Sequence, residues 1–574
     1  MNRNTELHFG HTPQIDIRRS KFEKSKSHKT TFNTGDIIPV YVDADILPGD
    51  TVQMDMAELV RMATPIYPIM DNLYMDIYWF FVPNRLLWDH WKAFWGENDD
   101  PWTQTTPYEV PQIEAPAGGW TEGTLADYMG IPTKVTGFSV NALPFRAYAK
   151  IWSDWFRDEN LKYSCHMYTD ETTRTGQTGS EVGYSYITGT ELGGKPCKAA
   201  KFHDYFTSGL PEPQKGPAAQ IPITGQATVQ AGTTDRLTNG MTADAIHWKT
   251  VASGKVADFS NLQNVNYVDT INFPNTSAKE GKSKAIYNTG TNVSVDAGFI
   301  TPVNLYADLS TMTAVTINSL RTAFAIQKYY ENAGLHGTRY IEYIRSVFGV
   351  TSSDARMQRA EYLGGTRVPI NIDQIIQTSA TDAVTPQGNT AGFSCTINRD
   401  SLFTKSFEEH GVLMCLAVVR TDHTYQQGLE KQWTRKTWVD YFNPFFSHLG
   451  EQPVYNKNIY LQADTVVDTD GNIVNNQAFS YQEAWAEYRY GINHVSGYMR
   501  SNATGSLDVW HFADDYNSLP YLSSDWIDEP YANVDRTIAV TSQLTHQFIA
   551  DFFFKTYYTR PMPIYSVPGL IDHV

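Results

Sequence analysis

Three acidic residues beside tryptophans form the cluster best suited to acid–base chemistry. Glu97, Asp99 and Asp100 lie between Trp95 and Trp102. Glycoside hydrolases use two carboxyl groups at a controlled separation, and rings beside them can stack on a sugar. Sequence neighbours after a helix end rarely reach that separation. We therefore interpret the cluster as a solvated loop.

Two other segments have the spacing of metal ligands without a complete set. His8 and His11 are at a metal-compatible spacing, but two histidines alone make a weak site. The segment 468–472 (DTDGN) resembles part of a calcium loop, yet Val466 and Gln477 stand where the first and last carboxylates are needed. We interpret 468–472 as a hairpin turn, and we expect no metal and no cofactor.

Other catalytic signatures are missing from the sequence. It has no GxxxxGK[ST] phosphate loop, no GxGxxG after a strand, no HExxH and no GxSxG elbow. Its cysteines show neither CxxC pairing nor metal-like spacing with histidine, so we interpret them as reduced packing residues: Cys165, Cys197, Cys395 and Cys415. The sequence therefore predicts a protein that is not an enzyme.

Composition and apolar patterning favour one fold class and one cellular compartment for synthesis. Aromatic residues make up 13% of the chain and charged residues 19%, with 39 Gly and 28 Pro, which is typical of many strands joined by turns. At 574 residues, one fold with large insertions is expected. The formal net charge of −17 repels polyanions. No secretory signal pattern opens the sequence, and the longest apolar run, 412–419, suits a buried strand, so we expect synthesis in a cytoplasm.

Hydrophobic periodicity predicts the main elements. Alternation over 73–81 predicts a strand ended by Pro83, followed by one aromatic helix between Asn84 and Gly96. Its aromatic stripe is interpreted as core, with a partner-subunit surface as the alternative. Further predictions are strands from 37, at 51–56, 412–420 and 548–559, and helices from Pro144 and at 320–333 ended by Gly334.

Three polar or irregular segments interrupt this pattern. Residues 1–35 carry six cations between positions 18 and 29 and show no apolar periodicity, which predicts a basic arm, with a solvated tail as the alternative. Residues 211–302 are rich in Thr, Gly, Ala and Asn, which indicates a functional or disordered insertion. After residue 560, three prolines impose an extended tail that cannot join a sheet interior.

Several blocks resemble one protein family in its order along the chain. They are FVPNRLLWDHWKAFWGEN (81–98), NALPFRAYAKIWSDWFRDENL (141–161), GTRYIEYIRSVFGVTSSDARMQRAEYLGG (337–365), TYQQGLEKQWTRKTWVDYFNPFFSHLG (424–450) and TRPMPIYSVPGLIDHV (559–574). The chain resembles the major capsid proteins of gokushoviruses, which are small single-stranded DNA phages of the microvirus family.

The resemblance implies an all-β dominated fold, a viral jelly roll built as an eight-stranded antiparallel sandwich with long loop insertions and a few amphipathic helices. Residues 36–210 and 303–574 would form the jelly-roll core, and 211–302 the protrusion at the threefold axes. Sixty copies would assemble in the host bacterial cytoplasm into a T=1 icosahedral shell around circular single-stranded DNA. The implied partners are a small basic DNA-binding protein, a minor pilot protein, an internal scaffolding protein and a host cell-surface receptor.

Three sets of contact residues follow. DNA or the small basic protein is expected to contact the arm through Arg18, Arg19, Lys21, Lys24, Lys26 and Lys29. A neighbouring subunit, or alternatively the same subunit, is expected to bury Met562, Ile564, Tyr565, Val567, Leu570 and Ile571. Host attachment is assigned to Trp248, Phe259 and Tyr267.

The alternative function is a β-rich protein that binds or hydrolyses polysaccharide. It is suggested by 34 Tyr, 14 Trp and the acidic balance of the chain. The sequence shows no secretory signal pattern, which such a protein would be expected to have. This function would also leave the arm and the tail without a role.

Overall fold

The computed structural model describes residues 18–97, 108–217, 317–337, 339–379, 381, 386–542 and 544–565, together with short strands between 228 and 308. The chain divides into a main unit, formed by 1–215 and 331–574, and a second unit, formed by 216–330.

The first large sheet of the main unit contains the N-terminal and C-terminal strands. β1 (Ser20–Glu23) and β2 (Lys26–Phe32) are successive segments along one edge of β23 (Phe548–Arg560), which pairs on its other side with β4 (Thr51–Met62). β19 (Thr396–Ser406) forms the far edge. We call this the exposed sheet. Part of the predicted arm is thus built into a sheet, because β23 supplies its backbone partners.

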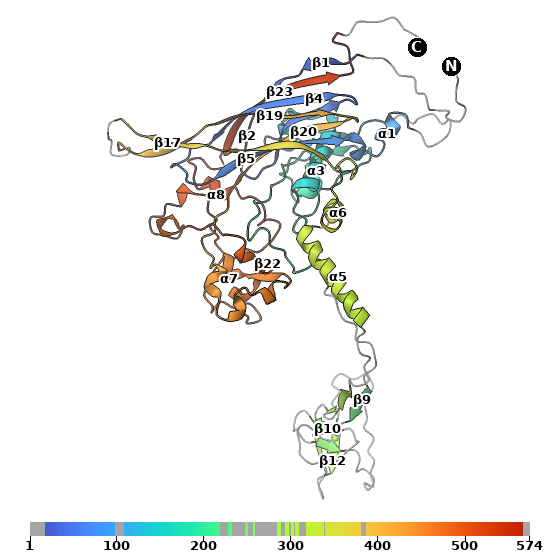
Figure 1. The fold of residues 1–574 in the computed structure, drawn as a ribbon, viewed down its shortest axis with the longest axis vertical. Helices are drawn as coiled ribbons and strands as arrows, with labels where there is room; N and C mark the ends of the chain where they lie inside the picture. Colours follow the sequence, from blue (N-terminus) through green and yellow to red (C-terminus); the bar gives the residue numbers. More distant parts are fainter. Residues whose placement is uncertain are drawn as a thin grey trace, which may run out of the picture. The chain divides into compact units, whose positions relative to one another are not determined.

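The second large sheet contains the most apolar strands. Its order is β16 (Glu361–Pro369), β5 (Leu73–Pro83), β20 (Gly411–Thr421) and β3 (Ile38–Ile46), and every pairing is antiparallel. We call it the covered sheet. With β1 and β2 counted as one interrupted strand, each sheet has four positions, and the connections β2–β3, β3–β4 and β4–β5 each cross between the sheets. This is the predicted eight-stranded antiparallel jelly roll. Figure 1 labels β23, β4 and β19 of the exposed sheet and β5 and β20 of the covered sheet.

The core between the sheets follows from strand alternation. In β4, Val52, Met54 and Met56 are buried, while the residues between them are more exposed, as the sequence predicted. The fully buried Trp79 ring of β5 lies 5.3 Å from the Tyr41 ring and 5.8 Å from the Phe554 ring, measured between centroids. Aromatic rings from both sheets therefore interlock at the centre of the sandwich.

Residues of the main unit that follow β5, between 84 and 199, cover the outer face of the covered sheet. α3 (Leu143–Ile151) continues into a π-helical turn (Trp152–Phe156), as the apolar spacing from Pro144 predicted. The buried Tyr148 of α3 donates a hydrogen bond of 2.6 Å to the carbonyl of Ile37. The smaller elements here are β6 (Gln112–Glu114), α2 (Leu125–Tyr128), β7 (Ser139–Asn141), β8 (Arg174–Thr175) and α4 (Tyr186–Gly189).

The aromatic segment after β5 corrects one prediction. Instead of one helix, it forms a 3-10 turn (Asn84–Leu86) and α1 (Trp91–Phe94). The chain leaves helical geometry between them because the N–H of Asp89 donates to the carbonyl of Thr169 at 3.1 Å. Trp88 is consequently buried, whereas Trp95 is exposed and stacks on His410 with 4.7 Å between ring centroids.

The predicted helix at 320–333 is longer than expected. α5 runs over Ile317–His336, so Gly334 lies within it, and Gly337, with a φ of 83°, follows its last residue. Left-handed backbone at this position favours glycine and ends the helix. α6 (Tyr340–Phe348) follows and leads towards β16.

The second unit contains the predicted insertion. Its strands form three small sheets: β9 (Thr228–Ala231) with β15 (Leu305–Asp308), β10 (His247–Thr250) with β11 (Val256–Asp258) and β14 (Ile300–Pro302), and β12 (Lys284–Asn288) with β13 (Val293–Ala297).

The remaining elements lie after β16. β17 (Ile372–Ile376) pairs with β18 (Thr390–Ser394) before β19. Between β20 and β23, the chain forms β21 (Gln452–Tyr455), α7 (Asn456–Ile459), β22 (Ala478–Gln482) and α8 (Ala532–Asp535). The predicted turn at 468–472 is confirmed, because Val467 and Ile473 form a bridge and the Asp468 carboxylate accepts from the N–H of Asp470 at 2.9 Å. Among the described residues, no helix combines the length and hydrophobicity needed to cross a membrane.

Candidate contact surfaces

The outer side of the exposed sheet is a surface on which basic residues from several strands gather, including two of the six predicted ones. Strand register turns five cations outward against three carboxylates: Lys21, Lys29, Arg61, Arg399 and Lys555 against Glu23, Asp55 and Asp551. Phe553 and Tyr557 stand among them, and the Lys21 ammonium lies 4.2 Å from the centroid of the Tyr557 ring. We call this surface the exposed face. It is net cationic in a chain of net charge −17.

The structure separates the six predicted arm residues. Lys21 and Lys29 lie on the exposed face, and Lys29 is 3.2 Å from the Asp551 carboxylate. Lys24 instead reaches the buried Asp43 carboxylate at 2.9 Å, and Lys26 donates to the Val42 carbonyl at 3.0 Å. The remaining two are Arg18, which is exposed, and Arg19, which donates to the hydroxyl of Thr51 at 2.7 Å and to the carbonyl of Thr559 at 3.1 Å. Part of the cationic set is therefore used to hold the sandwich edge together.

The Lys24 contact belongs to a buried polar group at that edge. Asp43 accepts a hydrogen bond of 2.5 Å from the Tyr558 hydroxyl, which in turn lies 2.9 Å from the Tyr41 hydroxyl. Burial acts to raise the pKa of Asp43, but the hydrogen bonds from Tyr558 and Lys24 outweigh it and the pKa falls. Asp43 thus remains a carboxylate that fastens β3 to the interrupted edge strand.

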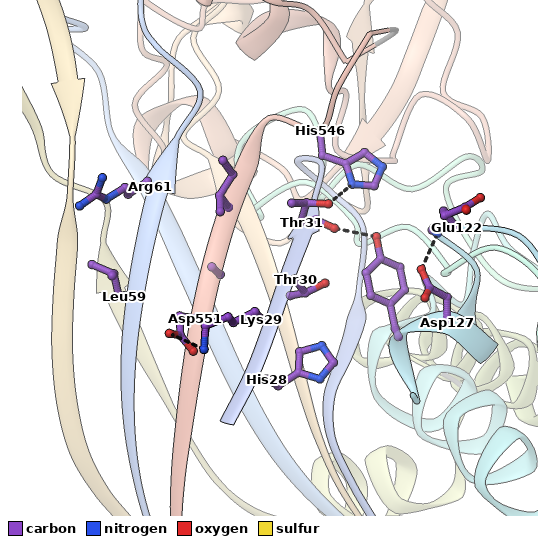
Figure 2. Close-up of a pocket in the computed structure, with 14 residues that line it drawn as sticks. His28, Lys29, Thr30, Thr31, Leu59, Arg61, Glu122, Asp127, His546 and Asp551 are labelled. Carbon is purple, nitrogen blue, oxygen red and sulfur yellow. Dashed lines mark hydrogen bonds and ion pairs between the residues drawn. The ribbon is translucent and has the colours of Figure 1, made fainter. Parts of the chain in front are cut away.

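A groove of ≈ 700 Å³ lies beside the exposed sheet, between β2, β23 and the loop before α2. Figure 2 shows His28, Lys29 and Arg61 on the strand side and Asp127 with Glu122 on the loop side. α2 is fixed to β2 because the Tyr128 hydroxyl donates to the Thr31 carbonyl at 3.0 Å. His546, which lies just before β23, places Nδ1 2.8 Å from the Thr31 hydroxyl. Burial, with Lys26 nearby, lowers the pKa of His28. The groove therefore mixes both signs of charge.

Most of the acidic and histidine residues that suggested chemistry lie outside the part of the chain that the structure describes. Asp99, Asp100, His8 and His11 lie outside the described residues, and Glu97 is exposed near Lys92. In the part of the chain that the structure describes, no three His, Cys, Asp or Glu side chains are grouped to hold a metal ion. Cys165, Cys197 and Cys415 are buried and Cys395 is half-buried, which agrees with their interpretation as packing residues.

A buried charged cluster escaped the sequence analysis. His423, just after β20, places Nδ1 2.9 Å from Asp514 and Nε2 3.0 Å from Glu529. Burial would lower the pKa of His423, but the two carboxylates raise it to about 10. Lys201 lies 3.8 Å from Asp514, and the Thr421 hydroxyl donates to Glu529 at 2.6 Å. We call this the His423 cluster. It joins both long insertions of the main unit to the end of β20.

The other predicted contact residues are described only in part. Met562, Ile564 and Tyr565 are exposed at 42%, 63% and 81%, whereas Val567, Leu570 and Ile571 lie outside the described residues. Trp248 lies in β10 of the second unit, and Phe259 and Tyr267 are outside the described residues. The assignments of these residues stay predictions.

Comparison with known proteins identifies the family. Residues 11–570 match the family model described as "Capsid protein (F protein)". The chain belongs to this capsid protein family. Chains named "Capsid protein VP1" are similar to this capsid protein over nearly their whole length: 41% identity with that of Chlamydia phage 1 (98% of this chain, 97% of the relative), 42% with that of Spiroplasma virus 4 (96% and 96%), and 38% with that of Bdellovibrio phage phiMH2K (99% and 98%).

These matches confirm the resemblance noted from the sequence blocks. The capsid protein has a structural role in a self-assembling shell, which agrees with its jelly-roll fold. They give no support to a polysaccharide-binding or polysaccharide-hydrolysing function.

Proposed function

We propose that sixty copies of this capsid protein form a T=1 icosahedral shell around a circular single-stranded DNA genome, with the exposed face turned towards the DNA. The orientation towards DNA is proposed because the exposed face is cationic and aromatic, whereas the protein as a whole is acidic. Cations contact phosphates without reading sequence, and Phe553 and Tyr557 offer rings on which unpaired bases can stack.

The charge of such a shell requires further partners. Sixty chains of −17 sum to roughly −1,000, so five outward cations per subunit cannot neutralise a genome alone. We propose that a small basic DNA-binding protein and cations supply the remainder. An internal scaffolding protein and a minor pilot protein complete the expected internal partners. Assembly is placed in the host bacterial cytoplasm.

The experiment replaces Lys21, Lys29, Arg61 and Lys555 with Gln and measures DNA per purified particle by the ratio of absorbance at 260 and 280 nm. Shells of about 3.9 MDa, from sixty chains of 64.8 kDa, should still form, with reduced DNA content. The salt dependence of single-stranded DNA binding should become shallower by roughly three in log–log slope. The matched control is Lys92→Gln, since Lys92 is 63% exposed and lies away from the exposed face. Undiminished DNA content would refute the assignment.

Two further roles are proposed for the remaining contact sets. The second unit, with Trp248, Phe259 and Tyr267, is assigned to the host cell-surface receptor, because its turn-rich sequence can diverge without disturbing the jelly roll. Its deletion should abolish adsorption and spare assembly. The tail with Met562, Ile564 and Tyr565 is assigned to a neighbouring subunit. Truncation after Arg560 should then give a folded chain that does not assemble, whereas an unfolded chain would place the tail in its own core.

A further inference from the structure

The segment 433–449, in the interval between β20 and β21, presents a dense row of exposed apolar side chains. We call it the aromatic segment. Phe445 is 93% exposed, and Trp433 and Trp438 are 72% and 71% exposed. The other large apolar residues exposed along it are Val439, Tyr441, Phe442 and Leu449. Single exposed apolar residues are ordinary, but a continuous group of this size marks a contact site.

The aromatic segment is held in shape by its own polar side chains. The Asp440 carboxylate accepts hydrogen bonds from the N–H groups of Lys436 and Thr437 at 2.9 and 2.7 Å. Three residues later, Asn443 Oδ1 accepts from the N–H of Phe445 at 3.1 Å, which caps the 3-10 turn Pro444–Phe446. These short-range bonds fix the backbone, so the aromatic rings lose little further freedom on binding.

Trp485 and Tyr488, which come later in the chain, contact the backbone and a ring of the aromatic segment. Trp485 donates from Nε1 to the Phe446 carbonyl at 2.8 Å, and its ring packs edge-on against Phe442 with 5.8 Å between centroids. The Tyr488 hydroxyl accepts from the N–H of Phe442 at 3.2 Å. Trp485 holds a φ of 64°, which is costly for a bulky residue and is maintained by these contacts.

Charge argues against nucleic acid as the occupant of this surface. Residues 431–449 contain three Lys or Arg residues, of which Lys431 and Arg435 each lie 3.4 Å from the Glu487 carboxylate, whose side chain is 9% exposed. Asp440 adds a carboxylate within the segment. Lys436 alone offers little phosphate attraction, whereas binding of single strands needs a cationic groove along the stacking rings. A protein surface is the better match.

The exposed area is that of one side of a subunit interface. Buried aromatic side chains contribute about 150–250 Å² each, so five rings exposed by half to nine-tenths supply roughly 600 Å². This is at the upper end of patches on monomers, about 300–600 Å², and close to the roughly 800 Å² per partner of a standard interface. We propose that the aromatic segment docks on a second copy of this chain, with Phe445 as its anchor. The inference rests on the proposed shell, because a second copy is the partner that every shell supplies.

The first test is the assembly of Phe445→Ser. Because Phe445 is 93% exposed, its replacement should leave the melting temperature of the unassembled subunit unchanged within about 2 °C. We expect the subunit concentration needed for particles to rise at least tenfold, as measured by sedimentation velocity. The matched control is Tyr521→Ser, since Tyr521 is 72% exposed in the same interval between β20 and β23 and should assemble as the unchanged chain does. Assembly of Phe445→Ser at the unchanged concentration would overturn the inference.

The second test identifies the occupant directly. A photoreactive p-benzoylphenylalanine at position 445 should cross-link two capsid chains in purified particles, giving a product of twice the 64.8 kDa chain mass, and the same group at position 521 should not. A cross-link to DNA or to a different protein, or none at all, would overturn the inference. Failure of the unchanged chain to form particles would instead refute the proposed shell, and sedimentation of that chain alone reports it.

Discussion

The two large sheets of the jelly roll share a core but differ on their outer sides. β20 in the covered sheet is buried at every position except Arg420, because α3 and its neighbours pack over it. β23 in the exposed sheet alternates between buried and accessible residues along its whole length. The central strands β5 and β20 of the covered sheet are therefore packed on both faces, whereas the exposed sheet keeps one face accessible to partners. This difference separates residues that hold the fold from residues available for assembly.

The largest expected loss of unfolding free energy comes from disrupting the His423 cluster, which joins the insertions of the main unit to the end of β20. His423→Gln removes the cation between Asp514 and Glu529 and leaves both buried carboxylates without it. Breaking a buried charge pair from one side costs about 4 kcal/mol. Equilibrium urea unfolding of the unassembled subunit at pH 7 measures it. An effect below about 1 kcal/mol would mean that the cluster does not fasten the insertions.

The same cluster predicts a pH dependence. The folded pKa of His423, about 10, lies above its unfolded value near 6.5, so the folded state binds the proton more tightly. This stabilisation is complete below pH 6.5 and is lost as the pH rises through 10. The unfolding free energy of the unchanged chain should fall across that window more steeply than that of His423→Gln. Parallel curves would contradict the prediction.

A matched pair of phenylalanines tests the two outer faces directly. Phe80 of β5 is 1% exposed and packs against Trp155 and Tyr362, whereas Phe553 of β23 is 47% exposed on the exposed face. Phe80→Ala should cost about 3 kcal/mol and Phe553→Ala less than about 1 kcal/mol in unfolding free energy. Equal costs would show that the exposed face also contributes to folding stability.

The smallest expected effect distinguishes two lysines of the N-terminal strands. Lys24 pairs with Asp43, whose side chain is 3% exposed, so Lys24→Gln should cost about 1 kcal/mol. Lys29 pairs with Asp551 in solvent, where ion pairs contribute little, so Lys29→Gln should change stability by less than about 0.5 kcal/mol. Denaturant midpoints compare the two variants. A larger loss for Lys29→Gln would place that residue in the fold rather than on a contact face.

Sequence patterns predicted the elements whose apolar residues form a continuous run or recur at a regular spacing. The apolar run of β20, the alternation of β4 and the apolar stripe of α3 each follow from burial on defined faces. β1 and β2 were missed because an edge strand with a solvent-facing side carries polar residues at most positions. The expected helix at 84–96 was wrong, because Thr169, distant in sequence, accepts the hydrogen bond that interrupts it.

The contact residues were less predictable than the fold. Partners of His423 lie 91 and 106 residues away, and no local pattern indicates such a meeting. The cations 18–29 look alike in sequence, and only strand register separates Lys29 on the exposed face from Lys26 against Tyr41. The aromatic segment was readable as apolar, but whether its rings face the core or solvent depends on the capped turns and on Trp485.

The position of β23 has a consequence for synthesis on the ribosome. This strand comes from the last 27 residues of the chain, yet it lies between the edge formed by β1 and β2 and the strand β4. At about 5–20 residues per second, translation takes roughly half a minute to two minutes before the exposed sheet can close. Nascent or prematurely terminated chains that lack β23 therefore cannot complete the exposed sheet, because β1 and β2 have no other strand to pair with in it.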